Sequence, residues 1–129
     1  MNQQEEGLKK RTKQFALDVI AFSRALPTTE PASSINRQLV RAATGVGANY
    51  RATCRSRSKT EFVSRIAVAL EEEDESAFWL EIVSESGLST DERVPRLLAE
   101  ADELCAIFAA SRITAANNLR RHGDSPTQI

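Results

Sequence analysis

A chain of 129 residues is long enough for one domain with one hydrophobic core. Aromatic residues make up 5% of the chain, and it has five glycines and four prolines, so its composition favours helices over a β-sandwich or β-barrel. The formal net charge is −1, and no apolar run approaches the roughly 20 residues of a membrane-spanning helix, so we expect no membrane insertion.

The N-terminus argues against export, and the few cysteines and histidines argue against a metal or cofactor. The N-terminus has no apolar segment after its charges, so it is not a secretory signal, and Cys54 and Cys105 are expected to be reduced thiols in a bacterial cytoplasm. A di-iron site in a bundle needs two Glu-x-x-His motifs, and the only histidine is His122. Zinc binding and a cysteine nucleophile fail for lack of histidines too, so the sequence predicts no metal and no cofactor.

Apolar periodicity predicts a first helix over residues 8–26, ended by Pro27 and preceded by a polar segment, residues 1–7, outside the helix. A second helix is predicted over residues 34–55, with Ser33 or Ser34 as its N-cap. The core side of this helix carries small side chains, and Gly45 and Gly47 should let a neighbouring helix approach closely. The opposite side carries a row of arginines about five turns long. These arginines are Arg37, Arg41, Arg51 and Arg55.

A third helix is predicted over residues 59–86, capped by Ser58 or Thr60 and followed by Gly87. It has two apolar faces roughly opposite each other, whereas a surface helix needs one, so we expect a second subunit to cover the outer face. The predicted oligomer interface consists of the outer apolar residues and two flanking acids: Val68, Glu71, Glu75, Phe78, Trp79 and Ile82.

A fourth helix is predicted over residues 91–119, capped by Ser89 or Thr90, and residues 120–129 are predicted to be a loose tail. Four long amphipathic helices with short connectors, and no competing β pattern, predict an all-α fold. We expect an antiparallel up-and-down four-helix bundle in which residues 1–129 form a single domain.

Charge is distributed unevenly along the chain. Residues 33–65 carry seven basic residues against one acid, a net charge of +6, and residues 71–103 carry twelve acids against two arginines, a net charge of −10. The basic residues form a solvated surface, a phosphate-binding face for RNA or DNA, or a partner for the acids of a neighbouring copy. The predicted nucleic-acid contacts are Arg37, Arg41, Arg51, Arg55, Arg57 and Lys59.

The acidic run at residues 71–75 is the best candidate for catalysis, because carboxylates spaced three and four apart share a helix face and can hold Mg²⁺. All-α nucleoside triphosphate pyrophosphohydrolases carry such a pattern, but they need a second acidic pair. Glu100, Asp102 and Glu103 supply one only loosely. We therefore predict a non-enzymatic, self-assembling bundle, with an Mg²⁺-dependent nucleotide hydrolase as the alternative.

Glu73 lies within the core stripe of the third helix, where a carboxylate must be paired or protonated. Arg112 and Asn49 are its candidate partners on the neighbouring helices. The alternative is that Glu73 lies near an opening of the bundle and reaches water.

Three segments, residues 38–49, 57–62 and 66–70, resemble the four-helix-bundle proteins encoded in intervening sequences of bacterial 23S rRNA genes. That family is similar to the accessory variability determinant protein of diversity-generating retroelements. The resemblance implies nucleic-acid association and a ring-like homo-oligomer, commonly a pentamer, but no settled biochemical function. Where family members usually carry Glu-Gly, this chain has Ala52-Thr53. The matching positions are Arg41, Ala42, Ala43, Asn49, Arg57, Ser58, Glu61, Phe62, Ala69, Leu70 and Glu75.

Overall fold

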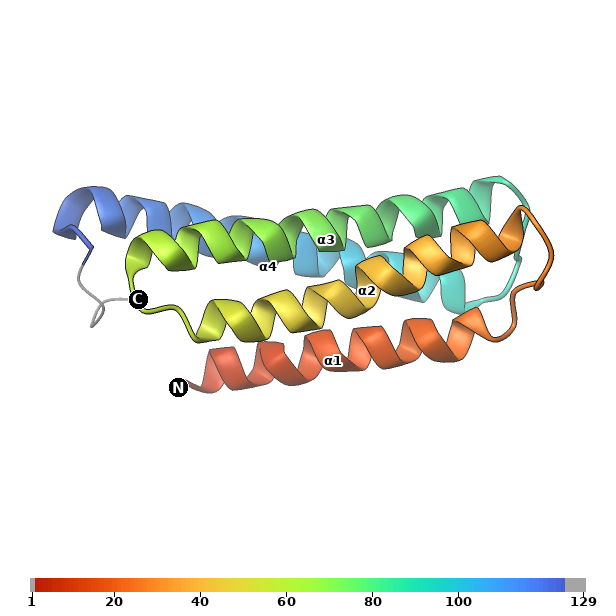
Figure 1. Ribbon diagram of the computed structural model, residues 1–129, viewed down its shortest axis with the longest axis horizontal. Helices are drawn as coiled ribbons and strands as arrows, with labels where there is room; N and C mark the ends of the chain where they lie inside the picture. Colours follow the sequence, from red (N-terminus) through yellow and green to blue (C-terminus); the bar gives the residue numbers. More distant parts are fainter. Residues whose placement is uncertain (1, 125–129) are drawn as a thin grey trace.

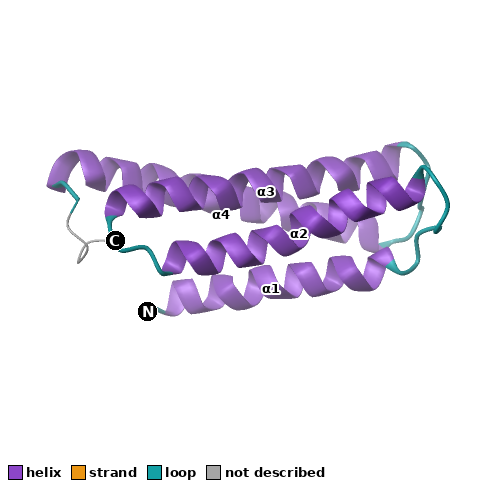
Figure 2. Cartoon of the chain, viewed as in Figure 1, coloured by secondary structure: helices purple, strands orange, loops and turns teal. Residues whose placement is uncertain are grey.

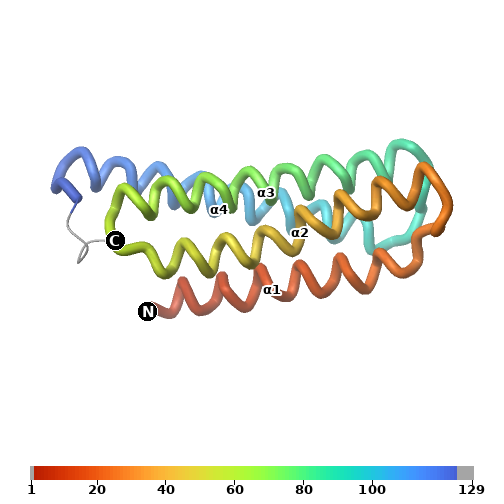
Figure 3. Tube along the Cα trace, viewed as in Figure 1, coloured from red at the N-terminus to blue at the C-terminus, as the bar shows by residue number. Residues whose placement is uncertain are grey.

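The structure, a computed structural model, describes residues 2–124 and consists of four antiparallel helices packed side by side (Figure 1). Short loops join the helices, and no strand occurs within this part of the chain (Figure 2). The backbone trace reverses direction at each loop, which gives the up-and-down order (Figure 3). The predicted all-α four-helix bundle is confirmed. The helices are α1 (Gln3–Ser23), α2 (Ala32–Cys54), α3 (Lys59–Glu85) and α4 (Arg93–His122).

The outer helices differ from their predicted bounds more than the inner ones do. α1 begins at Gln3 rather than at residue 8, because the Asn2 side chain caps it by accepting a 2.8 Å hydrogen bond from the Glu5 backbone N–H. α4 continues to His122, so the first residues of the predicted tail are helical, and Gly123 ends the helix at a positive φ of 71°. Residues 125–129 of that tail lie outside the described residues.

The predicted N-caps are correct for one of the three helices that follow a loop. The Ser58 hydroxyl accepts a 3.1 Å hydrogen bond from the Glu61 backbone N–H at the start of α3. At α2 the predicted serine caps are wrong, since the Glu30 carboxylate accepts from the backbone N–H of Ser34 instead. At α4 the Asp91 carboxylate accepts from the Arg93 N–H, in place of Ser89 or Thr90. Carboxylates suit this role because helix N-termini carry partial positive charge.

The core lies between all four helices, and α3 is its most enclosed member because it packs extensively on both α2 and α4. The predicted close approach is tight at Gly45, where a Cβ atom would lie 3.1 Å from the Glu72 carboxyl group of α3. α1 packs mainly against α2, and Gly47 lies at ordinary contact distance from α1. A Cβ atom on Gly47 would lie 3.7 Å from the Thr12 carbonyl oxygen of α1. Within residues 2–124, no helix is both long and apolar enough to cross a bilayer.

Candidate functional site

The arginines of α2 are all exposed, as predicted, but the two ends of the row differ. Near the start of α2, Arg37 lies 3.9 Å from the Glu30 carboxylate, and the charge of Arg41 acts on the Glu72 carboxyl group. At the other end, Arg51 and Arg55 make no ion pair within residues 2–124. An arginine whose charge is not already balanced is better placed to bind a phosphate.

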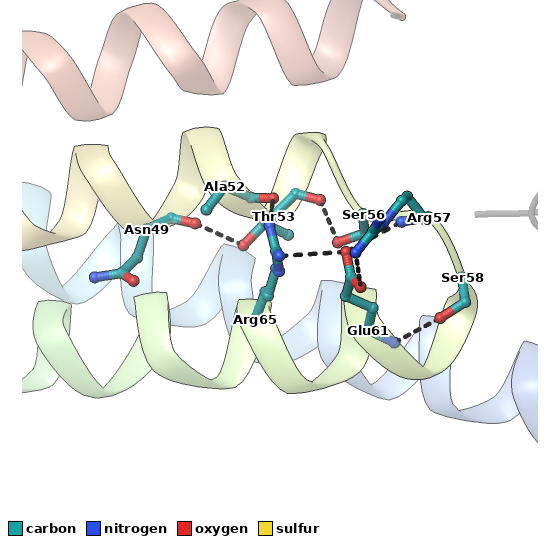
Figure 4. Close-up of polar contacts among 8 residues, drawn as sticks. All are labelled: Asn49, Ala52, Thr53, Ser56, Arg57, Ser58, Glu61 and Arg65. Atoms are coloured by element: carbon teal, nitrogen blue, oxygen red, sulfur yellow. Dashed lines mark hydrogen bonds and ion pairs between the residues drawn. The ribbon is translucent and has the colours of Figure 1, made fainter.

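The corner between α2 and α3 is fixed by a group of hydrogen bonds (Figure 4). The Arg65 guanidinium donates to the Ala52 carbonyl at 2.7 Å and lies 3.3 Å from the Glu61 carboxylate, so it ties α3 to the last turn of α2. Glu61 also accepts from the Arg57 backbone N–H at 3.2 Å. These bonds hold the backbone of the corner, and the Arg57 side chain is 87% exposed and lies 3.9 Å from the Glu61 carboxylate.

Lys59 departs from the prediction that it contacts nucleic acid. Its side chain is 2% exposed, so in this structure a phosphate cannot reach it as the sequence predicts. It lines a cleft of about 440 Å³ at the end of the bundle where α1 begins and α4 ends. The Thr60 backbone N–H donates a 2.8 Å hydrogen bond to the Asp124 carboxylate. That bond and the charge of Lys59 hold the pKa of Asp124 below its usual value. The cleft is lined by Asn2, Gln4, Glu5, Leu8, Tyr50, Lys59, Phe62, Ile107, Ala110, Ser111, Thr114, Ala115 and Asn118.

The outer face of α3 presents apolar side chains to solvent, as the two-faced pattern predicts. Phe78 is 49% exposed and Val68 is 41% exposed, whereas Trp79 is half-buried and packs against the core. The rings of Phe78 and Trp79 meet edge to face, with centroids 5.0 Å apart. Within the described residues, the Trp79 indole nitrogen is buried without a hydrogen-bond partner.

The five acidic side chains of residues 71–75 do not all lie on the surface of α3, because Glu73 points into the core and is 0% exposed. Neither of its carboxyl oxygens has a hydrogen-bond partner within residues 2–124. Burial, and to a smaller extent the nearby Glu100 charge, raise the pKa of Glu73 to about 9, so the group is neutral at pH 7.

Glu73 is buried and protonated rather than paired, so its predicted partners are wrong, and so is the alternative that it reaches water. The Arg112 side chain is exposed, and the Asn49 amide donates to the Gly45 carbonyl of its own helix. The charge that acts on Glu73 is that of Glu100, which accepts two 2.7 Å hydrogen bonds from the Arg11 guanidinium of α1.

Cys54 and Cys105 are both free cysteines and lie far apart in the sequence. Both thiols are half-buried, and burial is the largest of the effects that raise their pKa, that of Cys105 to about 12. Such thiols are poor nucleophiles near neutral pH. Among the described residues, no three His, Cys, Asp or Glu side chains are placed to hold a metal ion.

Two comparisons match this bundle to known proteins. The family model of 23S rRNA-intervening sequence proteins matches residues 5–110. A solved structure from Bacteroides thetaiotaomicron, a protein with unknown function from the S23 ribosomal protein family, superposes with a TM-score of 0.72 at 20% identity, covering 84% of this chain and 96% of that chain. At this identity the likeness shows the fold alone. A search of curated proteins finds no match.

Proposed function

The chain belongs to the family of 23S rRNA-intervening sequence proteins, and from this premise we propose that it is a non-enzymatic four-helix bundle that self-assembles and binds RNA or DNA. The observation that carries self-assembly is the exposed apolar face of α3. The resemblance to this family, noted from the sequence, adds the expectations of a pentamer and of nucleic-acid association. The two unpaired cysteines fit a protein that works in the reducing cytoplasm.

The support for self-assembly is an exposed aromatic residue on this face. Phe78 exposes about half of its surface although the same helix buries its other apolar face in the core. Aromatic side chains usually dominate the energy of protein interfaces, and the acids Glu71 and Glu75 share this outer face of α3 with them. A second copy that covers Phe78, Val68 and Ile82 removes this apolar surface from water.

Light scattering on a sizing column tests the assembly. We expect a mass that is a multiple of 14.2 kDa at micromolar concentration, and a Phe78→Ala variant with a lower mass and an unchanged helical circular-dichroism spectrum. Leu17 of α1 is also 49% exposed, so Leu17→Ala is the matched control and should leave the mass unchanged. A wild-type mass near 14.2 kDa would refute self-assembly.

Nucleic-acid binding is proposed from the exposed arginines of α2 and the corner that follows it. Such binding should weaken steeply as salt rises, because each neutralised phosphate releases counterions. Fluorescence anisotropy with a labelled 23S rRNA fragment and a labelled DNA duplex at low salt is the direct measurement. If neither probe forms a complex, this part of the proposal is wrong.

The absence of catalysis is proposed from the geometry of the acidic run. The acids with the helical spacing of the hydrolase pattern are Glu71, Glu72 and Glu75, and among the described residues no three acidic side chains are placed together to hold a metal ion. Isothermal titration with Mg²⁺ and a panel of nucleoside triphosphates should give no binding heat. Nucleotide hydrolysis that requires Mg²⁺ and is abolished in a Glu72→Gln variant would establish the enzyme instead.

A further inference from the structure

The bundle is divided into a basic half and an acidic half along its length. The segments at residues 2–13, 46–70 and 104–124 form the half in which α1 begins, α2 meets α3 and α4 ends (Figure 1). This basic half contains twelve of the 17 basic residues and four of the 18 acids, a net charge of +8, which leaves −9 for the rest of the chain. A net charge of −1 therefore conceals two strongly charged halves.

α4 contributes to this half in a way that its length makes possible. It has 30 residues against 21 in α1, so its last turns project beyond the start of α1 (Figure 1). The projecting turns carry Arg120 and Arg121, both exposed. Arg120 donates to the Asn117 side chain, and Arg121 makes no ion pair within residues 2–124. Arginines here also complement the partial negative charge of the helix C-terminus.

We propose that nucleic acid binds to the end of the basic half, across the α2–α3 corner and the projecting turns of α4, rather than along the length of α2. The contacts come from Arg51 of α2, Arg55 and Arg57 of the corner, and Arg120 and Arg121 of α4. This inference rests on the proposed nucleic-acid binding and specifies the surface that performs it.

Two observations favour the end over the length of α2. The arginines nearest the start of α2 lie among acids, since Glu30 is beside Arg37 and Glu72 is near Arg41. In the proposed surface only Arg57 lies near a carboxylate, 3.9 Å from that of Glu61, and the other four arginines of the surface make no ion pair within residues 2–124. The exposed cations of the corner and the projecting turns are all arginines, whose planar guanidinium groups bind phosphate oxygens in pairs.

The acidic half also disfavours binding along the whole molecule. It holds the remaining fourteen acids, which repel a polyanion, and exposed charges act over roughly 10 Å at 0.1 M salt. Phosphates are therefore attracted at one end and repelled at the other. This arrangement places one end of the bundle against the nucleic acid with the other end pointing away.

The test compares two double variants that remove equal charge. Arg120→Ala with Arg121→Ala removes the α4 part of the surface, and Arg37→Ala with Arg41→Ala removes two arginines outside it. Anisotropy titrations of each variant and of wild type use one fluorescein-labelled single-stranded RNA and one DNA duplex over a series of salt concentrations. All four residues are exposed, so circular dichroism and thermal unfolding should show intact folds.

For the α4 variant we expect at least a tenfold decrease in affinity at low salt. The slope of log affinity against log salt should flatten by about one for each phosphate that the variant no longer binds. The Arg37 and Arg41 variant should keep the wild-type slope, and lysine at 120 and 121 should restore most of the slope.

Equal decreases in both variants, or a decrease only in the Arg37 and Arg41 variant, would overturn the inference while leaving nucleic-acid binding in place. Failure of wild type to bind either probe would remove the proposed function and the inference with it. If the α4 variant changes the oligomer mass in light scattering but not the slope, then the surface contacts the acidic half of another copy, and the inference is also wrong.

Discussion

At the residue scale, Glu73 decides how stability depends on pH. Its pKa is 4.5 in the unfolded chain and about 9 in the bundle, so the fold favours the neutral acid. The stability that its neutral form provides is complete below about pH 4.5, falls as the pH rises, and is lost by about pH 9. At pH 7 the Glu73 carboxyl group is ionised in the unfolded chain and neutral in the bundle. This difference lowers the free energy of unfolding by roughly 3 kcal/mol.

Glu73→Gln removes this titration, so the variant should be more stable than wild type at pH 7 by up to roughly 3 kcal/mol. Urea unfolding between pH 4.5 and 8.5 measures the difference, which should shrink toward zero at the acid end. Glu81→Gln, an exposed position on the same helix, is the control and should show no such trend. Parallel stability curves for Glu73→Gln and wild type would mean that the carboxyl group reaches water.

The sequence predicted that Glu73 is in the core stripe but assigned it the wrong partners. A helical wheel gives the angle of a side chain around its helix and not its height along the bundle. Glu73 raises the pKa of the Cys105 thiol, so the two lie at the same level of α3 and α4. Arg112 is seven residues further along, about 10 Å away, and is exposed.

At the element scale, α3 is the helix on which the others depend, since it packs against both neighbours along its length. Its start is fixed by the Ser58 hydroxyl, which accepts from the Glu61 N–H at 3.1 Å. Ser58→Ala should therefore lower the free energy of unfolding by about 1 kcal/mol in urea titrations. Ser64→Ala, an exposed change within the same helix, should be neutral or slightly stabilising. Equal effects at both positions would show that the cap contributes nothing.

The helices themselves were predictable because their apolar periodicity is strong, and α2 and α3 lie within two residues of their predicted bounds. The start of α1 and the end of α4 could not be predicted from periodicity, because each depends on a single capping residue. Asn2 extends α1 toward the N-terminus, and Gly123 sets the end of α4. The burial of Lys59 was also beyond prediction. It depends on a cleft to which α1, α2, α3 and α4 all contribute, and such a cleft leaves no periodic trace in the sequence.

At the scale of the whole molecule, the exposure of the α2 arginines and of Phe78 on α3 followed from the sequence, since both depend on the angle around one helix. The proposed surface across the α2–α3 corner and the end of α4 could not be predicted from the sequence. Arg120 and Arg121 were assigned to a tail, and their nearness to the corner depends on α4 reaching three residues further than predicted. Basic residues before a glycine are a signal for a helix end that could have corrected this.

The separation of +8 from −9 along one axis gives this nearly neutral protein a large electric dipole moment. A resin does not respond to net charge alone, because the molecule can turn its complementary end toward the beads. At pH 7 and low ionic strength we expect the same preparation to be retained by a cation exchanger and, in a separate run, by an anion exchanger. Its pI of about 5.9 predicts retention by the anion exchanger only. In the Arg120 and Arg121 double-alanine variant, elution from the cation exchanger should move to lower salt while elution from the anion exchanger changes little.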